Sequence, residues 1–348
     1  MPLQRPAQIH LLSFALLVFA SLGACTRREM LGTDCPLPER ACAGKACGEI
    51  CFACATGAVT PDVAGRCGAD GVCAVTDPVC GPGSTDGQAG ASGSLGCGKS
   101  GAVTGVQADR TITVSGQTRT YVLSVPAGYT GTTPLALIFA WHGPNMTGAL
   151  ARSAFNLESK SDGAAIFVYP DGVASGTWDL SAESADIQLF TALVDSISSR
   201  YCIDSDRIFS TGHGAGAFLT NTLGCYRGDV LRAIAPVEGG GPPSMLERAC
   251  TTKVAAMVVH GRNDPVVPFA LGQAARDYLL AQNGCTLQTA AWPPEPACAA
   301  YQGCQSDLPL IWCVHDEGQA WPNLTSDCTG GTCMDAGPLI WAFFSSFH

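Results

Sequence analysis

The chain has 348 residues, of which 47% are hydrophobic and 14% are charged, and 19 Lys and Arg residues against 29 Asp and Glu residues give a net charge of −10. The apolar content excludes disorder for most of the chain, and the length predicts about two domains. The basic residues form no cluster, so we expect no nucleic-acid partner, because phosphate binding requires a locally cationic surface.

Residues 1–24 have the pattern of a signal peptide. Arg5 precedes an apolar run over residues 11–22, which is too short to span a bilayer. The run ends in Leu22-Gly23-Ala24-Cys25, which resembles a bacterial lipobox. We therefore predict a secreted lipoprotein with Cys25 lipidated, held at the cell surface or outer membrane by its lipid anchor alone. An ordinary signal peptide with cleavage nearby is the alternative.

The 19 cysteines indicate an oxidising compartment. After Cys25 and a tether over 25–34, eight cysteines lie in residues 35–80 and ten in residues 97–348. Both numbers are even, so each block can close its own bridges, with a pairing that the spacing leaves open. Residues 35–80 have few large apolar residues, so we predict a small module in which disulfides replace a core. A zinc site at Cys51-x-x-Cys54 is a weaker alternative, and we expect no metal or cofactor.

Residues 81–96 are rich in Gly and Ser and predict a flexible linker. In residues 97–348, strands are predicted at 111–114 and 120–125, joined by a hairpin at Ser115-Gly116-Gln117. Further strands are predicted at 135–141, 165–169, 207–211, 255–260 and 310–314, and helices at 187–201, 215–225, 270–282 and 339–347. This alternation predicts a mostly parallel sheet with helices on both faces.

Three of these strands end in sequences that contain histidine and glycine, at the edge where such sheets bind ligands. They are Trp141-His142-Gly143, Gly212-His213-Gly214-Ala215-Gly216 and the run His260-Gly261-Arg262-Asn263-Asp264. In this order, with Tyr169-Pro170-Asp171-Gly172 and Gly318-x-x-Trp321-Pro322, they resemble the α/β-hydrolase esterases, in particular secreted feruloyl esterases and polyhydroxybutyrate depolymerases. The resemblance covers residues 97–348 and implies an α/β-hydrolase fold. It implies a carboxylic ester hydrolase that acts on feruloyl or acetyl esters or on polyhydroxyalkanoate.

Two of the three catalytic positions that the resemblance implies carry unsuitable residues. The serine nucleophile of Gly-x-Ser-x-Gly corresponds to Gly214, and the base histidine of Gly-His-x-Trp-Pro corresponds to Gln319. Glycine has no nucleophilic atom, and an amide does not titrate near pH 7. Asp264 matches the acid of the triad, although an ordinary turn aspartate is its alternative interpretation.

The resemblance also implies an oxyanion hole formed by backbone N–H groups at Ala215 and in the loop at Gly143. Ala215 follows the elbow position and retains its N–H. Pro144 follows Gly143 and has no N–H to donate, which suggests a weakened oxyanion hole.

Four further residues are candidates for the site, each with a packing role as the alternative. His315 and His213 are candidate substitute bases that would pair with Asp264, and a water activated by His315 and Asp264 is a mechanism without motif support. Trp178 and Trp321 are candidate walls of a cleft for an aromatic or sugar ligand.

The leading functional hypothesis is a pseudoenzyme, or a severely impaired ester hydrolase, that retains a cleft for an ester, phenolic, polysaccharide or polyester ligand. Loss of triad members costs about 10⁶-fold in kcat, and loss of a second member adds little because the triad works as a unit. An active esterase that uses non-standard catalytic residues is the first alternative. An adhesive or structural surface module is the second.

Overall fold

The computed structural model describes residues 93–173, 177–242, 250–293, 295–323 and 332–347, together with three short strands near the N-terminus. The chain divides into two compact units, Met1–Ala89 and Gly90–His348. In the first unit, β1 (Ile50–Ala53), β2 (Val63–Cys67) and β3 (Cys73–Ala74) form an antiparallel sheet in the order β1-β2-β3. The predicted signal peptide, the lipidation site Cys25, the zinc motif at Cys54 and most of the linker lie outside the described residues.

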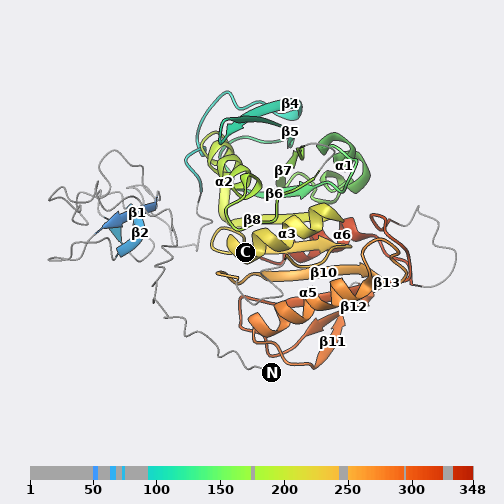
Figure 1. Cartoon of the computed structure of the whole chain (residues 1–348). Coiled ribbons are helices and arrows are strands. Elements are labelled where there is room, and N and C mark those ends of the chain that lie inside the picture. The colour runs from blue at the N-terminus through green and yellow to red at the C-terminus, as the bar shows by residue number, and fades with distance from the viewer. Residues whose placement is uncertain are drawn as a thin grey trace, which may run out of the picture. The chain divides into compact units, whose positions relative to one another are not determined.

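The second unit is built on a sheet of order β11-β12-β13-β10-β9-β8-β6-β7-β5-β4 (Figure 1). Strands β7, β6, β8, β9, β10 and β13 run parallel to one another, while the strands outside them pair antiparallel, β5 and β4 at one edge and β12 and β11 at the other. This confirms the mostly parallel sheet that the sequence predicts. The strands are β4 (Gly105–Val114), β5 (Gln117–Val125), β6 (Leu135–Trp141), β7 (Ala165–Pro170), β8 (Ile203–His213), β9 (Ala233–Val237), β10 (Ala255–Gly261), β11 (Thr289–Trp292), β12 (Glu295–Tyr301) and β13 (Leu310–His315).

Helices cover both faces of this sheet, as predicted (Figure 1). Buried side chains of α2, α3 and α5 pack in the core on one face, and those of α1 and α6 pack in the core on the other. Strand β6 serves both cores, because Phe139 and Trp141 point to one face and Ile138 and Ala140 to the other. The helices are α1 (Gly148–Phe155), the short 3₁₀ helix η1 (Glu158–Lys160), α2 (Ala185–Ser198), α3 (Ala215–Tyr226), α5 (Phe269–Gln282) and α6 (Ala336–Ser345).

Several predicted boundaries were wrong, and five elements of this unit were missed. Helix α2 ends at Ser198 instead of 201, and β8 begins at Ile203 instead of 207 because its polar first residues hide the strand pattern. Strand β9 is short and contains Pro236, which weakens the strand signal. The other missed elements are β11, β12, α1 and η1; the strands β11 and β12 are partly or largely exposed, and the helices α1 and η1 are short.

Disulfides close within the C-terminal block, as its even number of cysteines allows. The described bridges are Cys97–Cys202, Cys225–Cys250, Cys285–Cys304 and Cys298–Cys313, and Cys333 is disulfide-bonded as well. Cys298 and Cys313 also face each other in the register of β12 and β13. Bridges of this kind typically stabilise a fold by about 2–4 kcal/mol each. Within the described residues, no helix is long and apolar enough to cross a bilayer.

Candidate active site

The turn between β8 and α3 has the backbone of a sharp elbow, with Gly214 at its apex. Gly214 has φ 56° and ψ −115°, a conformation that residues with a side chain rarely adopt. Its N–H donates to the Val237 carbonyl of β9 at 3.0 Å. A Cβ atom at Gly216 would lie 2.1 Å from the Trp141 carbonyl oxygen, and one at Gly212 would lie 2.5 Å from the Gly216 oxygen. The elbow therefore needs its flanking glycines for close packing.

The space above Gly214 faces the side chain of Gln319. A Cβ atom added at Gly214 would lie 3.0 Å from Gln319 Nε2 and 3.6 Å from Pro144 Cδ. Gln319 belongs to the turn that follows β13, and the preceding Gly318 packs against the loop that carries Asp264, since a Cβ there would lie 3.6 Å from Pro265 Cδ. The ends of β8, β10 and β13 thus converge, and they bring the three triad positions into one region.

The nearest hydroxyl groups on β8 are engaged inside the sheet. Ser210 Oγ accepts a hydrogen bond from Trp141 Nε1 at 2.9 Å, and Thr211 Oγ1 donates to the Ala235 carbonyl at 2.6 Å. In the described part of the chain, the hydrogen bonds of the histidine rings run to backbone groups and to none of the Ser, Thr or Cys side chains. No alternative nucleophile is therefore coupled to an imidazole there.

His142 joins two loops at this edge of the sheet. Its Nε2 accepts from the Gly172 N–H at 2.9 Å, so Nδ1 carries the proton and donates to the Gly143 carbonyl at 2.7 Å. Burial lowers the pKa of His142, which keeps this neutral tautomer. Trp178 Nε1 donates to the His142 carbonyl at 3.0 Å, and Trp178 is only 9% exposed. Both side chains fix the loop of the proposed oxyanion hole by packing and hydrogen bonding.

His213 packs beside the elbow. A Cβ atom at Gly143 would lie 3.2 Å from His213 Nδ1, and the Phe155 ring lies 6.5 Å from the His213 ring between centroids. Trp321, which is 6% exposed, stacks on Phe155 at 3.9 Å. Burial lowers the pKa of His213 to about 4, so the ring is neutral near pH 7. His213, Trp178 and Trp321 are thus all packed side chains, which is the alternative that the sequence left open for each.

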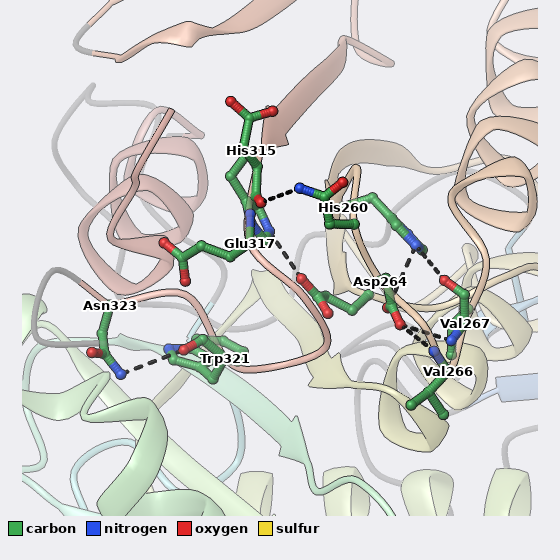
Figure 2. A network of polar contacts seen from close by, with 11 residues as sticks. His260, Asp264, Val266, Val267, His315, Glu317, Trp321 and Asn323 are labelled. Carbon is green, nitrogen blue, oxygen red and sulfur yellow. Dashed lines mark hydrogen bonds and ion pairs between the residues drawn. The ribbon is translucent and has the colours of Figure 1, made fainter. Parts of the chain in front are cut away.

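Asp264 is held by the loop that follows β10 (Figure 2). Its Oδ1 accepts from the N–H groups of Val266 and Val267, both at 2.8 Å, as a turn aspartate does. Its Oδ2 lies 3.7 Å from His260 Nε2, but that ring nitrogen is 2.9 Å from the Val267 carbonyl, to which it donates. The Asp264 side chain is fully buried. The carboxylate therefore has both a turn-forming oxygen and a second oxygen that faces the site.

A buried glutamate, which the sequence analysis missed, lies against Asp264. Glu238 follows β9, has φ 55° and is 0% exposed. Its carboxyl group lies close to that of Asp264 and faces the N–H of Ala320, the residue after Gln319. Burial, followed by the nearby Asp264 charge, raises the pKa of Glu238 to about 10. Its only signal in the sequence is an acidic residue at the end of an apolar segment.

His315, a candidate substitute base, contacts Glu238 and not Asp264. Its Nε2 lies 2.9 Å from Glu238 Oε1, and its Nδ1 accepts from the Glu317 N–H at 3.3 Å. Nε2 therefore carries the ring proton, and the lone pair of Nδ1 is already engaged. Burial lowers the pKa of His315 to about 4, and the side chain is fully buried. The expected hydrogen bond of His315 to Asp264 is not found among the described contacts, since His315 Nε2 faces Glu238 instead.

The chain is similar in sequence to known carboxylesterases and feruloyl esterases. A family described as Phospholipase/Carboxylesterase matches residues 181–292. Feruloyl esterase D of Neurospora crassa is 30% identical over 279 residues, which cover 75% of this chain and 92% of that protein. Probable feruloyl esterase C of Aspergillus terreus is 30% identical over 65% of this chain and 83% of that protein.

In the described part of the chain, no group of His, Cys, Asp or Glu side chains is arranged to hold a metal ion.

A solved structure of similar fold is the acetyl xylan esterase from Aspergillus awamori, with a TM-score of 0.52 and 14% identity over 69% of this chain and 99% of that one. This likeness concerns the fold alone. The fold agrees with the elbow, the parallel sheet and the order of the three strand ends. With the identity to feruloyl esterases over most of their length, these findings place the chain in the feruloyl esterase family of α/β-hydrolase esterases.

Proposed function

We propose that this chain is a member of the feruloyl esterase family that has lost ester hydrolysis and keeps a binding role for an ester, phenolic or polysaccharide ligand. One observation carries the proposal: the elbow presents Gly214, and Gln319 Nε2 lies 3.0 Å from the place where the nucleophile's Cβ would be. Neither residue attacks an ester or accepts its proton. Loss of the triad as a unit costs about 10⁶-fold in kcat.

Polar groups beside Gly214 support a retained binding role. Helix α3 has no side-chain cap, and the N–H groups of Ala217 and Phe218 donate to the Gly214 carbonyl, so the N–H groups of Ala215 and Gly216 are the ones that lack an acceptor within the helix. Gln319 Oε1 and His213 Nε2 are buried without a hydrogen-bond partner among the described residues. A ligand that carries carbonyl and hydroxyl groups offsets the cost of such unpaired atoms.

Apolar side chains at the same edge of the sheet suit an aromatic or acyl group. Leu150, Val173 and Val266 follow β6, β7 and β10, and they are 54%, 37% and 68% exposed. Exposed apolar residues that follow the carboxyl ends of three strands of the sheet favour a ligand with an apolar part. Together with the polar atoms beside Gly214, they support a phenolic acid or its ester as the ligand.

The test is an assay of the purified chain on p-nitrophenyl acetate and methyl ferulate, with calorimetric titration of ferulate and xylo-oligosaccharide. We expect hydrolysis at background and saturable binding of at least one ligand. Hydrolysis that disappears in the Asp264→Ala variant would instead establish an active esterase with non-standard residues. Neither binding nor hydrolysis would indicate an adhesive or structural surface module.

We infer that the protein is secreted and anchored through a lipid on Cys25. The Leu22-Gly23-Ala24-Cys25 sequence and the disulfides of the second unit support this placement, because disulfides persist in oxidising compartments. Labelling of cells with a radioactive fatty acid tests it. The label is expected in the natural chain and absent from a Cys25→Ser variant, and equal labelling of the two would contradict it.

A further inference from the structure

Two carboxyl groups, those of Glu238 and Asp264, share one fully buried site next to the turn that carries Gln319. Both side chains are 0% exposed, the two carboxyl groups are close enough to interact, and Glu238 Oε1, Glu238 Oε2 and Asp264 Oδ2 receive no N–H or O–H from the described residues. Carboxylates have only acceptor oxygens when both are ionised, so a hydrogen bond between them requires one proton. A buried pair of like charges without that proton is strongly disfavoured.

The donors around Asp264 leave one oxygen for this proton. Oδ1 receives the N–H groups of Val266 and Val267. Oδ2 is buried and receives no N–H from the described residues in hydrogen-bond geometry. His260 is 3.7 Å away, and its Nε2–H is directed to the Val267 carbonyl. The remaining partner of Oδ2 is the Glu238 carboxyl group.

Glu238 itself is fixed by groups from a different part of the chain. His315 Nε2 lies 2.9 Å from Glu238 Oε1, and the Ala320 N–H faces the same carboxyl group. The titratable groups that act on the pair are Glu317, which acts on Glu238, and His213, His260 and His315, which act on Asp264. His315 Nδ1 accepts from the Glu317 N–H, so the ring proton is on Nε2, the nitrogen that approaches Glu238, although the two atoms do not meet the geometry of a hydrogen bond.

We propose that Glu238 is a protonated carboxylic acid that donates its hydrogen bond to Asp264 Oδ2, and so takes the acceptor that a base histidine at position 319 would require. Glu238 is then a third residue, besides Gly214 and Gln319, that holds the site in an inactive arrangement. It is a positioning residue, because it acts through Asp264. This inference rests on the proposed loss of hydrolysis, and it adds that Asp264 is occupied in the folded chain.

The test starts from a chain repaired with Gly214→Ser and Gln319→His. Adding Glu238→Ala frees Asp264, and we expect kcat on p-nitrophenyl acetate to rise at least tenfold with little change in KM, because an acid that does not orient its histidine costs up to about 10⁴-fold in kcat. The acid limb of the kcat/KM profile should move to higher pH, since a free Asp264 carboxylate raises the pKa of the imidazole. Glu238→Gln is the matched control, because its amide N–H takes the same acceptor and leaves kcat unchanged.

Equal rates for the Ala and Gln variants of the repaired chain would overturn the proposal. A second measurement needs no repaired activity and uses the natural chain. Infrared difference spectra at pH 7 of the natural chain against Glu238→Gln should show a protonated carboxyl band that the variant lacks. Absence of that band overturns the proposal as well, even if the Ala variant does not fold. If the natural chain hydrolyses esters, the proposed function fails, and the infrared result still decides the state of Glu238.

Discussion

Gln319 Nε2 lies 3.0 Å from the point where a side chain at Gly214 would start. Positions 214 and 319 are therefore neighbours in space, although 104 residues lie between them in the sequence. A side-chain amide fills the place next to the elbow where an imidazole and a hydroxyl would meet. An active site at this place would therefore need a hydroxyl at position 214 and an imidazole at position 319.

Placing a serine at position 214 and a histidine at position 319 together should restore ester hydrolysis. We expect Gly214→Ser with Gln319→His to give measurable hydrolysis of p-nitrophenyl acetate, while each single change stays near background, because nucleophile and base act as a unit. Initial rates of the three variants, with Asp264→Ala added to the double variant as the control, measure this. A Gly214→Ser single variant as active as the double variant would contradict the expectation.

A side chain at position 214 should destabilise the elbow. Gly214 has φ 56°, and such a conformation costs a residue with a Cβ of order 1–3 kcal/mol. We expect Gly214→Ala to lower the free energy of unfolding by about that amount, as measured by urea titration. Adding Gln319→Ala removes the 3.0 Å contact and should recover part of the loss. Full recovery would mean that the contact, and not the backbone, sets the cost.

The free energy of unfolding should depend on pH through the protonation of Glu238. Its pKa is raised to about 10 in the folded chain, against about 4.3 for an unfolded glutamate. The folded state binds the Glu238 proton more tightly than the unfolded state does. The contribution of this proton to the free energy of unfolding is therefore complete below pH 4.3 and declines as the pH rises toward 10. Glu238→Gln removes the decline.

We therefore expect the free energy of unfolding of the natural chain to fall relative to Glu238→Gln between pH 5 and 9, by at most about 1.4 kcal/mol per pH unit. Urea titrations at several pH values measure it, and the exposed Glu183→Gln variant is the control. A difference between the natural chain and Glu238→Gln that stays constant over this range would count against a protonated Glu238.

His213 should produce the opposite slope at acid pH. Burial lowers its pKa to about 4, against about 6.5 in the unfolded chain, so the unfolded state binds more protons between these values. Stability should fall as the pH drops from 6.5 to 4. A neutral His213→Gln variant should lose less over this range, by up to about 1.4 kcal/mol per pH unit. Parallel curves for the natural chain and the variant would show that His213 is not the titrating group.

Much of the fold and of the candidate site could be predicted from the sequence alone, because the patterns that indicate them are formed by residues that are close together in the chain. The buried strand Leu135–Trp141 is a continuous apolar run, and the elbow is a glycine-rich segment between a strand and a helix. Gly214 and Gln319 were identified because each stands inside a short motif of an esterase family. Even numbers of cysteines predict bridges within a block, and the described bridges agree.

Tertiary structure alone decided what lies against Asp264. Glu238, Asp264 and His315 come from the ends of three different strands, β9, β10 and β13, and β9 escaped prediction because it is short and contains a proline. Hydrophobic period and motif spacing report on neighbours along the chain. The protonation of a carboxyl group depends instead on burial and on charges brought close by the sheet order, and these exist only once the strands have paired.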